Sequence, residues 1–99
     1  MRYCLRVIQS FSCEETAKIY EGKTSRRLPM NLVSVMRRKL EMLDGASALI
    51  DLRIPPSNRL EALKGDRAGQ HSIRINDQYR ICFFWTNKGA SDIEMTDYH

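Results

Sequence analysis

The stretch HSIRINDQYRICFFW, residues 71–85, combines two alternating segments with a turn between them. Residues 71–75 predict a strand, and Asn76 and Asp77 supply the short polar side chains that suit a tight hairpin turn. The returning segment, residues 79–85, alternates two sets of side chains: Tyr79, Ile81, Phe83 and Trp85 against Arg80, Cys82 and Phe84. Such alternation predicts a strand with one face on the core. The stretch therefore predicts a β-hairpin.

Further strands are predicted on both sides of this hairpin. Downstream, residues 87–89 form a turn, after which Ile93 and Met95 alternate with polar residues almost to residue 99. Upstream, residues 59–64 alternate as a strand does, and residues 65–69 form a loop rich in turn residues. The second half of the chain is thus predicted to be an antiparallel meander.

The start of the chain predicts a short strand and a first helix. Residues 5–11 alternate as a strand with one buried face. Ser12 and Glu15 match the S-x-x-E capping box, in which two side chains satisfy backbone amides at a helix start. The helix is expected over about residues 13–21 and to end at Gly22, which adopts the left-handed conformation without a steric penalty.

A second helix is predicted from Pro29 or Asn31 to residues 44–45. Its apolar residues recur at spacings of four, four and three and share one face: Leu32, Met36, Leu40 and Leu43. The basic run at residues 37–39 is expected largely off this face. Residues 46–52 predict a further short turn, and the prolines at 55–56 separate a helical half from a stranded half. The fold class is therefore α+β, with a mainly antiparallel sheet.

Length, charge and cysteine count narrow the class of protein. The 99 residues suit one hydrophobic core, so we expect a single domain over 1–99. No apolar run approaches the roughly 20 residues of a membrane span, and no secretory leader is expected, which favours the cytoplasm. Cys4, Cys13 and Cys82 predict neither a disulfide framework nor a zinc site. The net charge of +4 favours a polyanionic or acidic partner.

Polar residues of the second half suit metal-free cleavage of RNA. That reaction needs a base for the 2′-hydroxyl proton, an acid for the leaving 5′-oxygen, and cations for the phosphate charge. The candidates are Lys64, Asp66, Arg67, His71, Arg74, Arg80, Asp97, Tyr98 and His99. Taken singly, each basic residue is more often an ordinary solvated side chain. Sequence motifs of phosphate-loop, metal-dependent and serine-hydrolase sites are absent from the chain.

A family resemblance joins these residues. Residues 59–85, RLEALKGDRAGQHSIRINDQYRICFFW, and residues 92–99, DIEMTDYH, resemble the HigB toxins of the RelE/ParE superfamily of bacterial toxin–antitoxin pairs. The similarity includes VIQSF at 7–11 and residues 37–60. It implies a RelE-like fold, with two helices on one side of a twisted sheet. It also implies an endoribonuclease that needs no cofactor, cuts mRNA in the ribosomal A site and is inhibited by a HigA-type helix-turn-helix antitoxin.

The resemblance also implies site residues. The catalytic set is Lys64 in LKGDR, Arg80 in YRICF, and the terminal Asp97, Tyr98 and His99. Some members carry a histidine where this chain has Glu61, so the base differs from theirs or Asp97 takes that role. Phosphate contacts are expected from Arg37, Arg38, Lys39, Arg67 and Arg74, although the basic helix face is as readily a solvated surface or an antitoxin contact.

Several alternatives and further expectations remain at this point. A ParE-like poison of DNA gyrase shares the fold, and an inert nucleic-acid-binding component fits the charge.

Residues 1–6 are expected to be an extension, with a natural start at Val7. The α-carboxylate next to the imidazole of His99 favours its protonated form, which suits a general acid. We expect the antitoxin to dock on the helical half and to leave the active face open.

Overall fold

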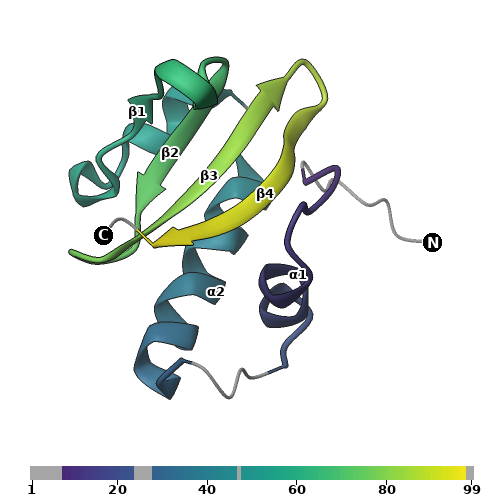
Figure 1. The fold of residues 1–99 in the computed structure, drawn as a ribbon, viewed down its shortest axis with the longest axis vertical. Helices are drawn as coiled ribbons and strands as arrows, with labels where there is room; N and C mark the ends of the chain where they lie inside the picture. Colours follow the sequence, from purple (N-terminus) through teal and green to yellow (C-terminus); the bar gives the residue numbers. More distant parts are fainter. Residues whose placement is uncertain (1–7, 24–27, 47, 98–99) are drawn as a thin grey trace.

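The computed structural model describes residues 8–23, 28–46 and 48–97, and two helices lie on one side of its antiparallel sheet (Figure 1). The helices are α1 (Glu14–Tyr20) and α2 (Met30–Gly45). The strands are β1 (Glu61–Ala62), β2 (Gln70–Arg74), β3 (Tyr79–Thr86) and β4 (Gly89–Asp97). Three short 3₁₀ helices complete the set: η1 (Leu49–Arg53), η2 (Pro56–Asn58) and η3 (Gly65–Arg67). The predicted α+β class is confirmed.

The strands follow one another in the order β1-β2-β3-β4, and every neighbouring pair is antiparallel. The predicted hairpin is β2–β3, in which Ile73 pairs with Ile81. At its turn, Asn76 Oδ1 accepts hydrogen bonds from the backbone amides of Gln78 and Tyr79, at 2.8 Å each. The register shifts between Cys82 and Phe84, where β3 meets β4.

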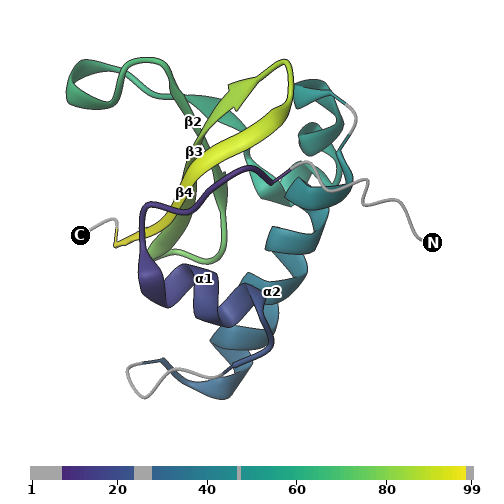
Figure 2. The ribbon, with the colours of Figure 1, turned by 90° about the vertical axis from the view of Figure 1, so that its right-hand side faces the viewer.

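The hydrophobic core lies between the sheet and α2, and α1 packs beside α2 (Figure 2). The predicted stripe on α2 is confirmed: Leu32, Met36, Leu40 and Leu43 are all buried. They meet the alternate side chains of the strands that face them: Ile73, Ile81, Phe83 and Ile93. Burial of this apolar surface is the main driving force that holds the helices on the sheet.

The basic run on α2 departs from its prediction at Lys39. This side chain is 8% exposed, whereas we expected it largely off the apolar stripe. Its ammonium donates a hydrogen bond to the Oδ1 of Asn58, which is itself buried in η2. The position is covered because Asn58 of η2 contacts Lys39 and Met42 on this part of α2, a tertiary contact that helical periodicity does not contain.

The predicted capping box at Ser12 is wrong. α1 begins at Glu14 with Cys13 as its N-cap, and no side chain caps it. The Ser12 hydroxyl instead donates to the carbonyl of Asp92 at 3.2 Å and to Glu94 Oε1 at 2.8 Å, both on β4. The end of α1 is as expected: Glu21 is the C-cap, and Gly22 follows with φ of +98°.

Two predicted strands are shorter than expected. Of residues 5–11, only 8–11 are described, and they form a single parallel bridge between Phe11 and Ile93. The backbone amide of Gln9 donates to the carbonyl of Ala90 at 2.7 Å, so the segment still lies along β4. Of residues 59–64, only Glu61–Ala62 form a strand. The predicted extension, residues 1–6, and the proposed start at Val7 lie outside the described residues.

Three further observations concern the described part of the chain. Neither of its helices has the length and apolar character needed to cross a membrane. Cys13 and Cys82 are free thiols. Within the same ranges, no group of three or more histidine, cysteine, aspartate and glutamate side chains is placed to hold a metal ion.

Candidate active site

The sheet face that points away from the helices carries most of the polar strand residues. Side chains alternate along a strand, and directly paired residues of an antiparallel sheet share a face. Because Ile73, Ile81 and Ile93 face the helices, the paired residues Arg74, Arg80 and Thr96 form a row on the opposite face. A second row runs parallel to the first: Glu61, Ser72, Cys82 and Glu94. We call this surface the outer face.

Arg80 is held at the centre of the outer face and is only 7% exposed. Its Nε donates to Ser72 Oγ at 2.7 Å, and its Nη2 donates to the carbonyl of Arg59 at 2.7 Å. The same Nη2 lies 3.3 Å from Glu61 Oε1, and the Glu61 side chain is 51% exposed. The structure thus places an accessible carboxylate against a fixed guanidinium. Sequence reasoning singled out both residues, but their contact depends on the pairing of β1 with β2.

A second ionic cluster connects β4 to two distant segments. Glu94 accepts the hydrogen bond from Ser12, and Arg67 Nη2 lies 3.1 Å from its other oxygen. Arg67 Nη1 also donates to Gln70 Oε1 at 3.0 Å. The hydrogen bond from Ser12 lowers the pKa of Glu94, Arg67 acts in the same direction, and burial opposes both. No local sequence pattern indicates a role for Glu94, because its partners Ser12 and Arg67 are distant in sequence.

Lys64 and Arg80 lie at opposite ends of β2. Lys64 is exposed and directly precedes η3, and the amide of its neighbour Leu63 donates to the carbonyl of Gln70 at 2.9 Å. Arg80 pairs with Arg74, four residues further along β2. At about 3.3 Å per residue, Gln70 and Arg74 are about 13 Å apart along β2, and Lys64 and Arg80 lie on opposite sides of this strand, so their backbone separation is larger. The structure therefore gives Lys64 a position beside the edge strand β1, whereas Arg80 lies on the interior strand β3.

Asp97 is the last described residue of β4. It ends β4 opposite Tyr79, one residue beyond the row that contains Arg80. Its Oδ2 accepts a hydrogen bond from Gln78 Nε2 at 3.2 Å. Tyr98 and His99, both predicted to be catalytic, follow Asp97 in sequence and lie outside the described residues.

The predicted phosphate-binding residues differ in their surroundings. Arg38 is exposed on α2, whereas Arg37 donates to the carbonyls of Ile19 and Lys23 at 3.0 Å each. Burial lowers the pKa of Lys39, and the nearby charges of Arg38 and Arg74 act in the same direction. The other two arginines form ion pairs: Arg67 with Glu94 and Arg74 with Asp77. Arg38 is thus the best placed of the five to meet a partner.

His71 lies away from this cluster. It pairs with Phe83, so its side chain is on the helix-facing side of the sheet. The two rings stack with their centroids 6.4 Å apart. The sequence grouped His71 with the polar strand residues, but strand alternation separates it from Arg80.

The architecture described above, with two helices on one side of an antiparallel sheet and ionic residues on the other, is that of a RelE-like α+β protein. The family of RelE-like HigB toxins of type II toxin–antitoxin systems matches residues 9–99. The chain belongs to this family.

The chain is also similar to individual proteins, two of which are named as HigB toxins or endoribonucleases. Toxin HigB-1 of Vibrio cholerae serotype O1 is 48% identical over 67 residues, which are 68% of this chain and 70% of that protein. Endoribonuclease HigB of Proteus vulgaris is 29% identical over 93 residues, which are 94% of this chain and all of that protein. An uncharacterized protein of Haemophilus influenzae is 38% identical over 74 residues, which cover 75% and 73% of the two chains.

Proposed function

We propose that this toxin is an endoribonuclease that cleaves mRNA in the ribosomal A site and thereby inhibits translation. The observation that carries the proposal is the outer face, where the carboxylate of Glu61 lies 3.3 Å from the guanidinium of Arg80. Acid–base cleavage of RNA needs an accessible proton acceptor beside fixed positive charge. The name of the Proteus vulgaris relative, an endoribonuclease, supports the same activity.

The proposed reaction uses the RNA's own 2′-hydroxyl and no metal ion. The 2′-oxygen attacks phosphorus as its proton passes to a carboxylate, and the bond from phosphorus to the 5′-oxygen breaks. Glu61 is the first candidate for the base because it is half exposed, and Arg80 fixes its position. Asp97 is the second candidate. His99 donates the proton to the leaving oxygen, Tyr98 assists, and Lys64 neutralises phosphate charge.

The proposed partners are the ribosome with its message and a HigA-type helix-turn-helix antitoxin. Membership in a type II toxin–antitoxin family implies an antitoxin, and the net charge of +4 suits RNA. The proposal places the protein in the cytoplasm, where translation occurs, and treats residues 1–99 as one domain.

The function is tested with purified ribosomes and an end-labelled message. We expect cleavage only of ribosome-bound mRNA, with 2′,3′-cyclic phosphate and 5′-hydroxyl ends, and no cleavage where the 2′-hydroxyl is replaced by hydrogen. Lys64→Ala and His99→Ala should each slow single-turnover cleavage about 10²- to 10⁴-fold. Lys88→Ala removes an exposed lysine in the β3–β4 turn and should cleave normally.

The same assay separates the alternatives. An intact message together with inhibited DNA gyrase would establish the ParE-like activity instead. Equal cleavage of free and ribosome-bound RNA would exclude the ribosome dependence. Glu61→Gln and Asp97→Asn identify the base. The cleavage rate falls at low pH as the base is protonated, and only the variant that lacks the base should lose this part of the pH–rate profile.

A further inference from the structure

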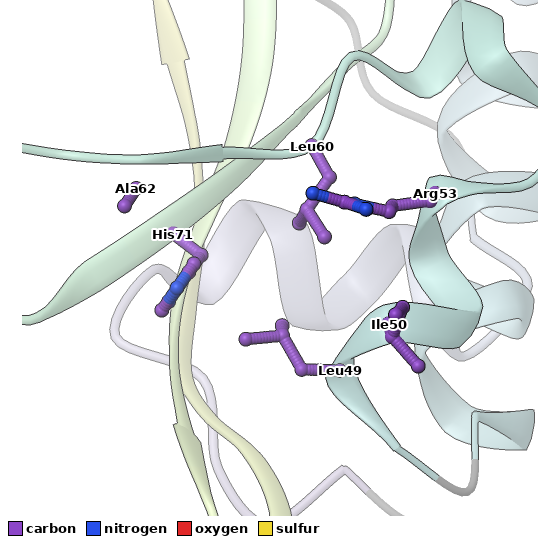
Figure 3. A pocket seen from close by; sticks show the side chains of 6 residues that line it. All are labelled: Leu49, Ile50, Arg53, Leu60, Ala62 and His71. Carbon is purple, nitrogen blue, oxygen red and sulfur yellow. The ribbon is translucent and has the colours of Figure 1, made fainter.

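A pocket on the helix-facing side of the sheet is left unused by the proposed cleavage reaction. It lies between η1 and the strands β1 and β2, with a volume of about 390 Å³. Its lining is mainly apolar: Leu49, Ile50, Arg53, Leu60, Ala62 and His71. Leu49 points toward His71, and Arg53 reaches toward Leu60 (Figure 3). This volume falls within the range of small binding pockets, roughly 300–1,000 Å³.

Strand alternation separates this pocket from the outer face. His71 and Ala62 pair with each other and line the pocket, whereas the adjacent pair, Ser72 and Glu61, contacts Arg80 on the opposite side. A ligand in the pocket therefore leaves the Glu61–Arg80 pair uncovered. The pocket and the candidate active site are separate surfaces.

Two observations indicate that the pocket binds a partner. Nδ1 of His71 is buried and has no hydrogen-bond partner in the described structure, although buried polar atoms are normally paired. Ile50 lines the pocket and is nevertheless 61% exposed. An exposed apolar side chain and an unpaired imidazole nitrogen in the same pocket suit a ligand with both apolar and polar groups.

Charge complementarity identifies the kind of partner. Arg53, on the pocket wall, is exposed, and the whole chain carries a net charge of +4. We propose that the pocket binds the antitoxin, through a segment in which an apolar side chain enters the pocket and a neighbouring carboxylate pairs with Arg53. This inference rests on the proposed toxin function, and it explains how the antitoxin binds while leaving the outer face open.

The test uses the full-length toxin and the antitoxin encoded beside it. Dissociation constants are measured for wild type, Ile50→Asp, Arg53→Glu and Ile54→Asp, and the free toxins are assayed on ribosomes. Ile54 is the matched control, because it is 75% exposed, lies four residues from Ile50 and does not line the pocket. We expect Ile50→Asp and Arg53→Glu to weaken binding at least tenfold and Ile54→Asp to change it less than twofold. All free variants should cleave mRNA at the wild-type rate, which also shows that they are folded.

Each other outcome is decisive. Equal affinities for Ile50→Asp and Ile54→Asp, or a wild-type toxin that does not bind the antitoxin, would overturn the pocket assignment. Slower cleavage by Ile50→Asp with unchanged antitoxin affinity would assign the pocket to RNA or the ribosome instead. If wild type binds the antitoxin with the expected pattern but leaves ribosome-bound mRNA intact, the cleavage proposal fails and the pocket assignment stands.

Discussion

Glu94 joins three parts of the molecule through one carboxylate. It lies on β4 and contacts Ser12, which precedes α1, and Arg67 in η3. Because η3 directly follows Lys64, the contact with Arg67 also restrains the segment that carries this proposed catalytic lysine. Glu94 is thus a candidate positioning residue as well as a source of stability.

Stability should depend on Glu94 in a pH-dependent way. The pKa of Glu94 is lowered in the folded protein, so its contribution is complete above the ordinary glutamate pKa of about 4.3. That contribution is lost as the pH falls from there through the folded-state pKa. Glu94→Gln should reduce the free energy of unfolding by about 1 kcal/mol at pH 7, since the side chain is partly exposed. The difference from wild type should shrink below pH 4.

Urea unfolding at a series of pH values measures this effect. Glu41→Gln is the control, because Glu41 is exposed on α2. A wild-type advantage over Glu94→Gln that stays constant from pH 7 to pH 3 would contradict the role of the charged carboxylate.

At the scale of elements, the apolar stripe of α2 carries the helix–sheet packing. Leu40 lies in the middle of this stripe and is fully buried. Leu40→Ala should lower the free energy of unfolding by about 2–5 kcal/mol, through lost apolar burial and the cavity left behind. Glu41→Ala changes the adjacent exposed residue and should alter stability by less than about 0.5 kcal/mol. Similar losses for the two variants in chemical denaturation would show that α2 does not pack as described.

Structural elements were predictable from the sequence where contacts between neighbouring residues determine them. The stripe of α2, the left-handed Gly22 and the Asn76 turn depend on residues close in sequence, and all three are confirmed. Ser12 has the right spacing for a cap, but its hydroxyl bonds to β4, more than 80 residues away. Lys39 is covered by η2 for the same reason. Local patterns fail where a distant segment offers a competing partner.

The candidate site is a property of the whole molecule and was only partly predictable. The family resemblance named Lys64, Arg80 and Asp97, and chain order placed them on or beside the strands. The ion pair between Glu61 and Arg80 depends on the register in which β1 joins β2, and no local pattern of a two-residue strand fixes that register. The separation of His71 from Arg80 follows from strand alternation once the helix-facing side is known.

The surface charge of the molecule predicts salt-dependent binding to the ribosome. Each phosphate contact on single-stranded RNA should contribute a slope of roughly −0.7 to the logarithmic dependence of affinity on salt. Arg38 is exposed, so we expect it to make one phosphate contact. Arg38→Ala should therefore make the slope shallower by about 0.7. Lys39→Met changes the neighbouring residue but should leave the slope unchanged, since its amine is buried against Asn58.

Binding isotherms at several salt concentrations check this prediction. The thermal midpoint of each variant serves as the folding control, because Lys39→Met removes a donor from a buried amide oxygen. If Lys39→Met lowers the slope as much as Arg38→Ala does, the helix opens on the ribosome and the buried amine becomes a phosphate ligand.

The bridge between Phe11 and Ile93 has a consequence for how the protein is made. Synthesis proceeds from the N-terminal end, so α1 and α2 are produced before the strands that bury their apolar side chains. Strand β4 follows the other three strands in sequence; it bridges Phe11 through Ile93, brings Glu94 to Ser12 and ends at Asp97. A nascent or truncated chain that lacks β4 therefore has exposed apolar surface and an incomplete outer face. We therefore expect a chain without β4 to be a target of the cell's protein quality control.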